Sequence, residues 1–338
     1  MPVSVVIPSW NGRPLLEQFL PSVITAASAY ASTGVPIEIL VVDDGSTDRT
    51  VEWIGELAVG PPVILRTLRT EENRGFGAAC NLGIREAAHP LIFLINNDLQ
   101  VEPDAIGPLG ERFDADPQQQ LFAVHCRVKD FGTNQDVGTG KMGGFSRGFL
   151  RVHRSFVTRE PAQGPRSSMF ASGGSAMFHR ERFLALGGFD ALFAPFYLED
   201  VELSYRAWKR GWSVEYEPRS VVRHRFSSTI GPLARRKIPQ IAQRHRLILH
   251  WIHLHDGRLL ASHVLWTAIL LVAAPLTFKP AFVGAFFGAL KRLPAISARR
   301  REERRHATRT DREVLALFAE LARRPDIRPY DDPRELDG

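Results

Sequence analysis

The stretch Val41-Val42-Asp43-Asp44-Gly45-Ser46-Thr47-Asp48 joins an apolar run to two adjacent acids and a turn. Runs rich in Val, Ile and Leu are typical of strands buried on both faces of a sheet. Four such runs occupy residues 3–7, 37–42, 63–68 and 91–95, with helical spacing between them at 14–29 and 47–57. This alternation predicts an α/β fold with a mostly parallel sheet, helices on both faces, and a ligand site beyond the carboxyl ends of the strands.

The later part of the sequence is less regular. Helical spacing recurs at 183–188 and 201–211, and a strand is predicted at 213–216. The Gly-rich stretch 138–148 and the Ser/Pro/Gly stretch 161–175 are predicted to be long loops that carry an acceptor site or a lid.

Acidic and amide side chains follow two of the predicted strands and recur later. Asp43-Asp44 follows the run 37–42, and Asn96-Asn97-Asp98 follows the run 91–95. Because the carboxyl ends of parallel strands meet at one edge of a sheet, both loops are expected to border one pocket. With Glu199-Asp200 further along the chain, we interpret the set as sites for a nucleotide, a metal ion and a transferred proton.

The composition fits one large α/β unit with an appendage. The chain has 338 residues, 44% of them hydrophobic, which allows a substantial core. With Cys80 and Cys126 as its two cysteines, a disulfide framework and a four-cysteine zinc site are excluded, and a reducing compartment is expected. Residues 1–8 have no basic region before their apolar run, so they predict a first strand and not a signal peptide.

These residues resemble the inverting glycosyltransferases of family 2, which have the GT-A nucleotide-sugar fold. The resemblance covers residues 1–230 and rests on six motifs in the family's order. Asn96-Asn97-Asp98 is most similar to the rhamnosyltransferase-like branch, and its Asn96 replaces the first carboxylate of the Asp-x-Asp pattern of other branches. The motifs are Val5-Val6-Ile7-Pro8-Ser9-Trp10-Asn11, Val41 to Asp48 as quoted above, Asn73-Arg74-Gly75-Phe76-Gly77-Ala78-Ala79-Cys80-Asn81, Asn96-Asn97-Asp98, Gly173-Gly174-Ser175-Ala176-Met177 and Tyr197-Leu198-Glu199-Asp200-Val201-Glu202-Leu203.

The resemblance implies a nucleotide-sugar donor at the sheet edge. Asp43 and Asp44 would accept hydrogen bonds from the N3–H of uracil or thymine and from ribose hydroxyls. Asp98 would hold a divalent cation, Mg²⁺ or Mn²⁺, that bridges the donor diphosphate, and His224 resembles a histidine that assists it. Thymidine diphosphate rhamnose is the favoured donor, with uridine diphosphate sugars next. The other implied donor-binding residues are Pro8, Arg74, Gly75, Gly77 and Asn97.

The resemblance also implies the groups that act on the acceptor. Asp200 would be the general base that takes the proton of the acceptor hydroxyl as it attacks the anomeric carbon from the face opposite the diphosphate. Glu199 cannot point the same way from a helix start, so it is predicted to contact the acceptor, together with Gly173 and Gly174.

Each assignment has a structural alternative. Asp-Gly-Ser before a helix is an ordinary cap and turn, and capping is expected of Ser46 or Thr47. Asp98 also fits a solvated turn, and a lone histidine such as His224 is more often structural. Glu199-Asp200 favours a helix N-terminus through the macrodipole. The donor-loop glycines also fit a plain turn.

A basic and apolar region, 231–338, follows the resemblance. Residues 259–278 contain no Asp, Glu, Lys or Arg, and as a helix they would cross the hydrocarbon core of about 30 Å. Basic residues precede this segment, and 291–312 holds nine Lys and Arg against three acids, which accounts for the whole formal charge of +6. By the positive-inside rule, both flanks belong in the cytosol.

An interfacial or re-entrant helical pair at 259–290, broken at Pro275 and Pro280, would keep both basic flanks on the cytosolic side. The sequence therefore predicts a protein on the cytoplasmic face of the plasma membrane, with contact to anionic lipid through 259–312. The alternative is a soluble apolar helix packed on the catalytic domain or on a second copy in a homo-oligomer. Nucleic acid is not an expected partner, because the basic tail has no recognition motif.

The predicted function is sugar transfer, by inversion, from a nucleoside diphosphate donor to a hydroxyl of a cell-envelope glycan. The membrane-seeking region favours a lipid-linked glycan acceptor. Two alternatives stay open: a nucleotidyltransferase on a similar sheet, and a non-catalytic sugar-binding scaffold.

Overall fold

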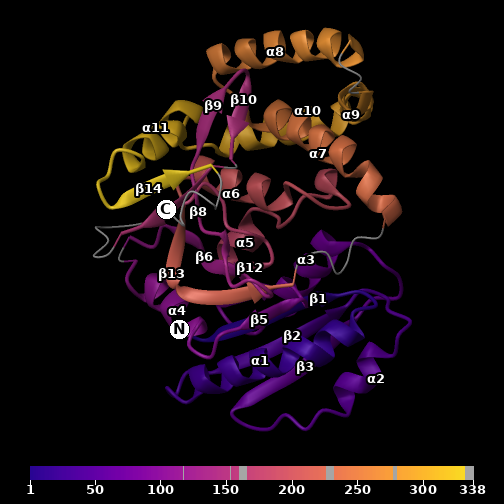
Figure 1. The fold of residues 1–338 in the computed structure, drawn as a ribbon, viewed down its shortest axis with the longest axis vertical. Coiled ribbons are helices and arrows are strands. Elements are labelled where there is room, and N and C mark those ends of the chain that lie inside the picture. Colours follow the sequence, from indigo (N-terminus) through magenta and orange to yellow (C-terminus); the bar gives the residue numbers. More distant parts are fainter. Residues whose placement is uncertain (117, 153, 160–165, 226–231, 277–279, 332–338) are drawn as a thin grey trace.

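The computed structural model describes residues 1–331 except 117, 153, 160–165, 226–231 and 277–279 (Figure 1). Nine strands form its main sheet: β1 (Val3–Ser9), β2 (Ile37–Asp43), β3 (Val63–Arg69), β4 (Leu91–Ile95), β5 (Leu99–Val101), β6 (Leu121–Asp130), β7 (Asp136–Gly138), β12 (Ser175–His179) and β13 (Ser213–His224). Their order is β3-β2-β1-β4-β12-β6-β13-β5, with β7 paired to β6. The first four strands run parallel, so their carboxyl ends meet at one edge, and β12 runs antiparallel between β4 and β6.

Side chains of the sheet alternate between two hydrophobic cores, one on each face. On β1, Val5 and Ile7 belong to one core and Val6 belongs to the other, as the twofold period of a strand requires. The helices of this half are α1 (Arg13–Ala31), α2 (Thr50–Gly55), α3 (Phe76–Glu86), α4 (Ile106–Asp114), α5 (Arg180–Ala185) and α6 (Glu199–Lys209). Because α1 and α4 cover one core and α3 and α6 the other, the predicted α/β architecture is confirmed.

Two of the predicted elements differ from the structure. The third strand, β3, lies at the sheet edge, so its face alternates and Ile64 is 59% exposed, whereas burial on both faces was expected. The second helix begins at Thr50 without a side-chain cap. The residues predicted to cap it form tertiary hydrogen bonds instead. Ser46 Oγ accepts from the backbone N–H of Asn11, and the Thr47 N–H donates to Asn11 Oδ1.

The Gly-rich stretch 138–148, predicted to be a loop, instead contributes short strands. Its chain forms parts of a hairpin, β9 (Gly144–Ser146) with β10 (Phe149–Arg151), and of a three-stranded sheet in the order β14-β11-β8. That sheet joins β8 (Gly140–Lys141), β11 (Ser155–Thr158) and β14 (Ile327–Tyr330). Of the other predicted loop, 161–175, residues 161–165 lie outside the described residues.

The part of the chain that follows residue 231 is mostly helical and packs on α6. Its helices are α7 (Pro232–His253), α8 (Gly257–Leu276), α9 (Pro280–Leu290), α10 (Leu293–His306) and α11 (Asp311–Leu321). Two buried polar contacts join this part to α6: Glu202 contacts His253 at 2.8 Å, and Lys209 contacts Asp311 at 2.8 Å. The expected domain boundary at residue 230 lies outside the described residues.

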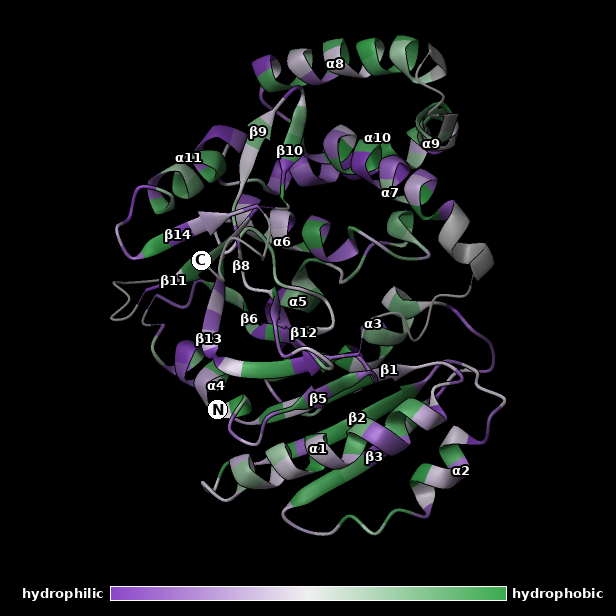
Figure 2. Ribbon diagram, viewed as in Figure 1, coloured by the Kyte–Doolittle hydropathy of each residue, from purple (hydrophilic) through white to green (hydrophobic). Residues whose placement is uncertain are grey.

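The helix α8 has an inverted arrangement of polar and apolar side chains. Its buried side holds His263 and Thr267, while Val264 and Val272 are 61% and 69% exposed. In Figure 2, green stretches run along this helix at the end of the molecule that lies away from the main sheet. Among the described residues, it is the one helix whose length and composition would let it cross a membrane.

Candidate functional site

The carboxylate of Asp44 holds the loop that precedes α3. Asp44 Oδ2 accepts the N–H groups of Arg74 at 3.0 Å and Gly75 at 2.8 Å, and Oδ1 accepts the Thr70 hydroxyl at 3.0 Å. A Cβ on Gly45 would lie 2.7 Å from the backbone of this loop, so the two loops touch. Both of the predicted donor-binding loops are therefore fixed to each other by a side chain that was predicted to bind the donor.

Asp43 lies beside Asp44 and is fully buried. Its Oδ2 accepts the Ser46 N–H at 3.3 Å and lies 3.5 Å from Arg69 Nε. Within the described part of the chain, no donor reaches Asp43 Oδ1. Asp43 thus keeps one carboxylate oxygen without a hydrogen bond at the carboxyl end of β2.

The loop after β4 is bound to the end of β1. Asn97 Nδ2 donates to Ser9 Oγ at 3.0 Å, and the Asp44 N–H donates to the Ser9 carbonyl at 2.8 Å. Pro8 is buried just before Ser9 and pairs with β2 in register with Val42. Three predicted site residues therefore lie around Ser9: Pro8 precedes it in the chain, and Asp44 and Asn97 donate hydrogen bonds to it.

Asp98 and His224 come together from distant parts of the sequence. Because β13 pairs with β5, His224 lies opposite Leu99, and its Nε2 is 3.1 Å from Asp98 Oδ1. Two cis ligands of an octahedral cation with bonds of about 2.1 Å are about 3 Å apart, so this pair fits a hard divalent cation. Among the described residues, no group of three or more His, Cys, Asp or Glu side chains is placed to hold a metal ion.

The glycines before β12 connect this edge to Asp200. The Asn96 N–H donates to the Gly174 carbonyl at 3.0 Å, and the Gly173 N–H donates to Asp200 Oδ2 at 3.3 Å. A Cβ on Gly174 would lie 2.4 Å from the Asn96 side chain. Contacts therefore run without a break from Asp44 through Ser9, the 96–98 loop and the two glycines to Asp200.

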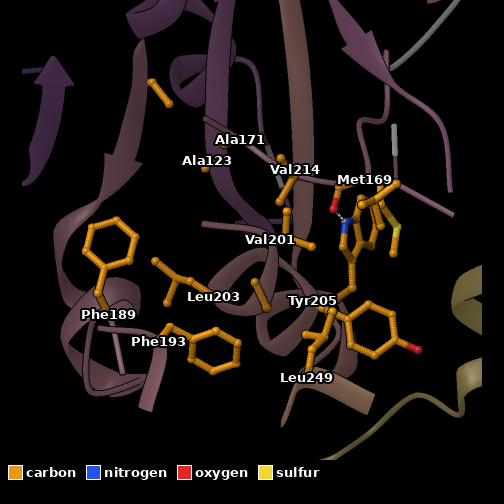
Figure 3. Close-up of a cluster of buried hydrophobic side chains, with 14 of the residues drawn as sticks. Ala123, Met169, Ala171, Phe189, Phe193, Val201, Leu203, Tyr205, Val214 and Leu249 are labelled. Carbon is orange, nitrogen blue, oxygen red and sulfur yellow. Dashed lines mark hydrogen bonds between the residues drawn. The ribbon is translucent and has the colours of Figure 1, made fainter. Parts of the chain in front are cut away.

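Glu199 and Asp200 form the first turn of α6, after a backbone that is left-handed at Tyr197 and Leu198, with φ of 75° and 70°. Two successive non-glycine residues in this region are strained and need surrounding structure to hold them. Figure 3 shows that structure: Val201 and the next turn of α6 lie in a cluster of buried aromatic and aliphatic side chains.

The two adjacent carboxyls differ in their surroundings. Burial and the charge of Asp200 raise the pKa of Glu199 to about 8, and among the described residues no donor reaches Glu199 Oε2. Burial also raises the pKa of Asp200, but the Val201 and Gly173 N–H groups and the charge of Lys141 oppose it. Asp200 therefore has more neighbours that favour its charged form than Glu199 has.

A cavity of about 260 Å³ opens at Gly174, next to the Gly173 that donates to Asp200. Asn96, Gly174 and His224 line it on the side of the sheet edge. Lys141 of β8 and His125 of β6 also line it, and neither was predicted to be a site residue. A single lysine among glycines, in a stretch predicted to be a loop, gave no signal in the sequence.

The donor-loop residues are placed as follows. Gly75 has φ of 88° and immediately precedes α3, where a side chain would be strained. A Cβ on Gly77 would lie 3.3 Å from Phe189. The Arg74 backbone is held by Asp44, as described above.

Comparison with known proteins agrees with this geometry. The family model described as "Glycosyl transferase family 2" matches residues 4–187, and a second, "Glycosyl transferase family group 2", matches 149–294. The chain belongs to glycosyl transferase family 2. The prediction of a family 2 glycosyltransferase with a GT-A-type fold is therefore confirmed.

Similar sequences and structures include glycosyltransferases of several kinds. Poly-beta-1,6-N-acetyl-D-glucosamine synthase of Staphylococcus aureus is 25% identical over 212 residues, which cover 63% of this chain and 48% of that protein. Dolichol-phosphate mannosyltransferase of Pyrococcus furiosus is 36% identical over 111 residues, which cover 33% of this chain and 30% of that protein. The chain thus spans about half the length, or less, of these curated relatives.

Solved structures of family-like enzymes share the fold. The S. aureus TarS 1–349 structure superposes with a TM-score of 0.54 at 13% identity and covers 96% of this chain and 91% of that one. The mannosyltransferase PcManGT of Pyrobaculum calidifontis, in complex with GDP-Man and Mn²⁺, superposes with a TM-score of 0.51 at 20% identity and covers 95% and 88%. At these identities the likeness establishes the fold alone.

Proposed function

We propose that this protein is an inverting, cation-assisted glycosyltransferase that moves a sugar from a nucleoside diphosphate donor to a hydroxyl of a cell-envelope glycan. The observation that carries the proposal is the unbroken line of contacts from Asp44 to Asp200, since it brings the donor loops and a carboxylate to one edge of the sheet. A donor bound at that edge would present its anomeric carbon near the start of α6.

Asp200 is the proposed general base. The N–H groups of Val201 and Gly173 favour its charged form, and the neighbouring Gly174 lines a cavity of about 260 Å³. Proton transfer from the acceptor hydroxyl to this carboxylate is worth about 10²- to 10⁴-fold in rate. Glu199, Gly173 and Gly174 would border the acceptor from the same side.

Asp98 and His224 are the proposed ligands of a Mg²⁺ or Mn²⁺ ion. When bound, such an ion neutralises charge that grows on the leaving diphosphate. A neighbouring fold was solved with Mn²⁺ and a nucleotide sugar, which supports a divalent cation here. Asp98→Asn and His224→Ala are expected to weaken Mn²⁺ binding measured by calorimetry. Equal Mn²⁺ affinity in both variants would remove these two residues from the role.

The favoured donor is thymidine diphosphate rhamnose, because Asn96-Asn97-Asp98 resembles the rhamnosyltransferase-like branch. Similar folds solved with UDP-GlcNAc and with GDP-Man keep uridine and guanosine donors as alternatives. A thermal-shift panel of nucleotide sugars with and without Mn²⁺ decides, because a ligand that binds only the folded state raises the melting temperature.

The base is tested by replacing it. Asp200→Asn is expected to lower transfer by about 10²- to 10⁴-fold while the donor still raises the melting temperature. Asp104→Asn, which removes an exposed carboxylate between β5 and α4, is the matched control and is expected to keep full activity. Full transfer by Asp200→Asn would exclude the proposed mechanism, and donor binding without any turnover by the wild type would favour a sugar-binding scaffold. Release of inorganic diphosphate from a nucleoside triphosphate mixed with a sugar phosphate would point to nucleotidyl transfer.

The acceptor is proposed to be lipid-linked and reached from the cytoplasmic face of the plasma membrane. The support is α8, whose apolar side is exposed, and the basic residues around it. We further propose that residues 1–230 form the GT-A domain and that 231–338, with its apolar segment 259–290, form a membrane-associating extension. Homo-oligomerisation through the same apolar helix is the competing use of that surface.

A further inference from the structure

The turn that leads into α6, residues 194–198, needs support from outside. Its Tyr197 and Leu198 have left-handed backbones, and such strain persists only where the surrounding structure holds it. Ala194, Pro195 and Tyr197 are exposed, so packing of their side chains into the core does not provide the restraint. Hydrogen bonds from a neighbouring element are therefore expected to hold this turn.

Two consecutive residues of α7 bind both ends of the 194–198 turn. Arg244 Nη2 donates to the Ala194 carbonyl at 3.0 Å, and His245 Nδ1 lies 2.8 Å from the Tyr197 carbonyl oxygen. The His245 side chain is fully buried, and its ring packs against Phe193 with 5.5 Å between the ring centroids. One turn of a helix from the C-terminal part of the chain thus contacts residues 193, 194 and 197.

The hydrogen bonds of His245 fix the position of its ring proton. Arg244 Nη2 lies 2.9 Å from His245 Nε2, and because a guanidinium group only donates, Nε2 is the acceptor. The ring hydrogen is therefore on Nδ1, which donates it to the Tyr197 carbonyl. Burial lowers the pKa of His245 to about 4, so the imidazole is neutral at pH 7. Arg244 and His245 therefore each give one N–H donor to a carbonyl of the turn.

The restraint passes directly to the first turn of α6. The Leu198 carbonyl, one residue after the bonded Tyr197 carbonyl, accepts the Glu202 N–H at 2.9 Å and begins the hydrogen bonding of the helix. Asp200 lies in this first turn, where its Oδ2 accepts the Gly173 N–H at 3.3 Å. A reoriented peptide at position 197 would rotate the first turn and would move Asp200 away from Gly173.

We propose that Arg244 and His245 are positioning residues that hold the 194–198 turn and thereby place Asp200 for proton transfer. The proposal rests on the proposed role of Asp200 as the base. A displacement of about 1 Å, caused by a change away from the reacting atoms, costs up to about 10²-fold in rate. The C-terminal helices would then contribute to the rate of transfer as well as to the proposed membrane contact.

The test compares nucleoside diphosphate release by four variants and the wild type, with Mg²⁺ and the donor that the thermal-shift panel selects. His245→Leu removes the N–H donor to Tyr197 and is expected to lower kcat by about 10- to 100-fold, while the KM for the donor stays unchanged. His245→Asn keeps an N–H near the position of Nδ1 and is expected to recover most of that loss. Arg244→Met keeps the aliphatic stem beside Gly288, removes the bond to Ala194, and is expected to lower kcat by about tenfold.

The matched control is His250→Leu. His250 is a buried histidine of the same helix, but its ring bonds to the Leu150 N–H of the hairpin and to the Arg246 carbonyl of its own helix. Its replacement is expected to lower the denaturation midpoint about as much as His245→Leu does and to leave kcat unchanged. Equal losses of kcat in His245→Leu and His250→Leu, or no recovery by His245→Asn, would overturn the proposal.

A second measurement needs no turnover. Exchange of the Glu202 amide hydrogen with deuterium reports whether the first turn of α6 is closed, because this N–H bonds to the Leu198 carbonyl. His245→Leu is expected to speed this exchange at least about tenfold, and His250→Leu is expected not to. Unchanged exchange in His245→Leu contradicts the role of His245.

This exchange measurement also separates the proposal from the proposed function. If the wild type releases no nucleotide from any donor, the proposed function fails, while exchange at Glu202 still decides whether α7 holds the turn. Arg244→Met, whose side chain is partly exposed, gives the same two readouts if His245→Leu does not fold.

Discussion

Single backbone positions decide the shape of the site. Gly174 accepts the Asn96 N–H and leaves no room for a Cβ, while Tyr197 and Leu198 bend the chain through the left-handed region just before the two acids. At Gly174 a side chain would displace the main chain, and at Tyr197 and Leu198 a more relaxed backbone would displace it. The site therefore depends on local geometry as much as on the identity of its carboxylates.

Gly174→Ala tests this dependence. The new methyl group would lie 2.4 Å from the Asn96 side chain, so the 96–98 loop must shift, and a loss of about 1–3 kcal/mol in the free energy of unfolding is expected, together with weaker Mn²⁺ binding. The control is Gly55→Ala at the exposed last residue of α2, where a Cβ would meet nothing within 4 Å. That change should alter the free energy of unfolding by less than about 0.5 kcal/mol, because it makes no new close contact. Denaturant unfolding measures both, and equal stability of the two variants would contradict the steric argument.

At the level of elements, α6 serves two purposes at once. Its first turn holds Asp200 against the Gly173 N–H and also buries Glu202 against Arg206 and His253. Because His253 of α7 bonds to Glu202 of α6, the C-terminal helices help to fix the position of the proposed base. The same packing explains how the left-handed turn before α6 is maintained.

The Glu202 ion pair gives a prediction on acid stability. Burial alone would raise the pKa of Glu202, but Arg206 and His253 outweigh it and lower the pKa to about 2. Because the folded pKa lies below the ordinary value of 4.5, the contribution is complete above about pH 4.5 and is lost as pH falls toward 2. Glu202→Gln should therefore cost about 3 kcal/mol at neutral pH and flatten this part of the stability curve.

The control for that prediction is Glu302→Gln. Glu302 contacts Arg299 at 2.8 Å but is 52% exposed, so its removal should cost less than about 1 kcal/mol. Urea unfolding from pH 2.5 to 7 measures both variants. A parallel shift of the whole Glu202→Gln curve, with the wild-type slope kept below pH 4.5, would show that Glu202 is not the group that titrates.

The sequence predicts the residues at the carboxyl ends of the parallel strands better than those that line the cavity from the other strands. Asp43-Asp44 and Asn96-Asn97-Asp98 follow apolar runs, and the ends of parallel strands must meet, so their proximity follows from composition and topology. Lys141 reaches the site through pairings between residues far apart in sequence, which no local pattern encodes. The prediction that Ser46 or Thr47 caps the second helix was wrong, because both residues instead form hydrogen bonds with Asn11, a tertiary contact.

Considered as a whole, the molecule has a sheet-bearing end and an end with exposed apolar side chains. α8 turns His263 and Thr267 inward and Val264 and Val272 outward, the reverse of a soluble surface helix (Figure 2). Such a face is suited to hydrocarbon, and basic side chains near it are suited to anionic headgroups.

A vesicle assay tests the membrane contact. The double change Val264→Gln and Val272→Gln is expected to lower co-sedimentation with vesicles of anionic phospholipid at least tenfold, because two exposed apolar side chains no longer enter the acyl region. Ile64→Gln, on the exposed edge strand β3, removes a comparable exposed apolar group from the other end and should bind as the wild type does. If the double variant becomes monomeric while vesicle binding persists, the apolar face joins two copies and does not enter lipid.

The pairing of β14 with β11 also bears on how the protein is made. Residues 327–330 close a small sheet whose far strand carries Lys141, and Tyr330 contacts the hydroxyl of Thr139, 191 positions earlier in the chain. A nascent polypeptide that is still short of these residues cannot complete that wall. The small sheet that carries Lys141 can therefore be completed only after residues 327–330 have been synthesised.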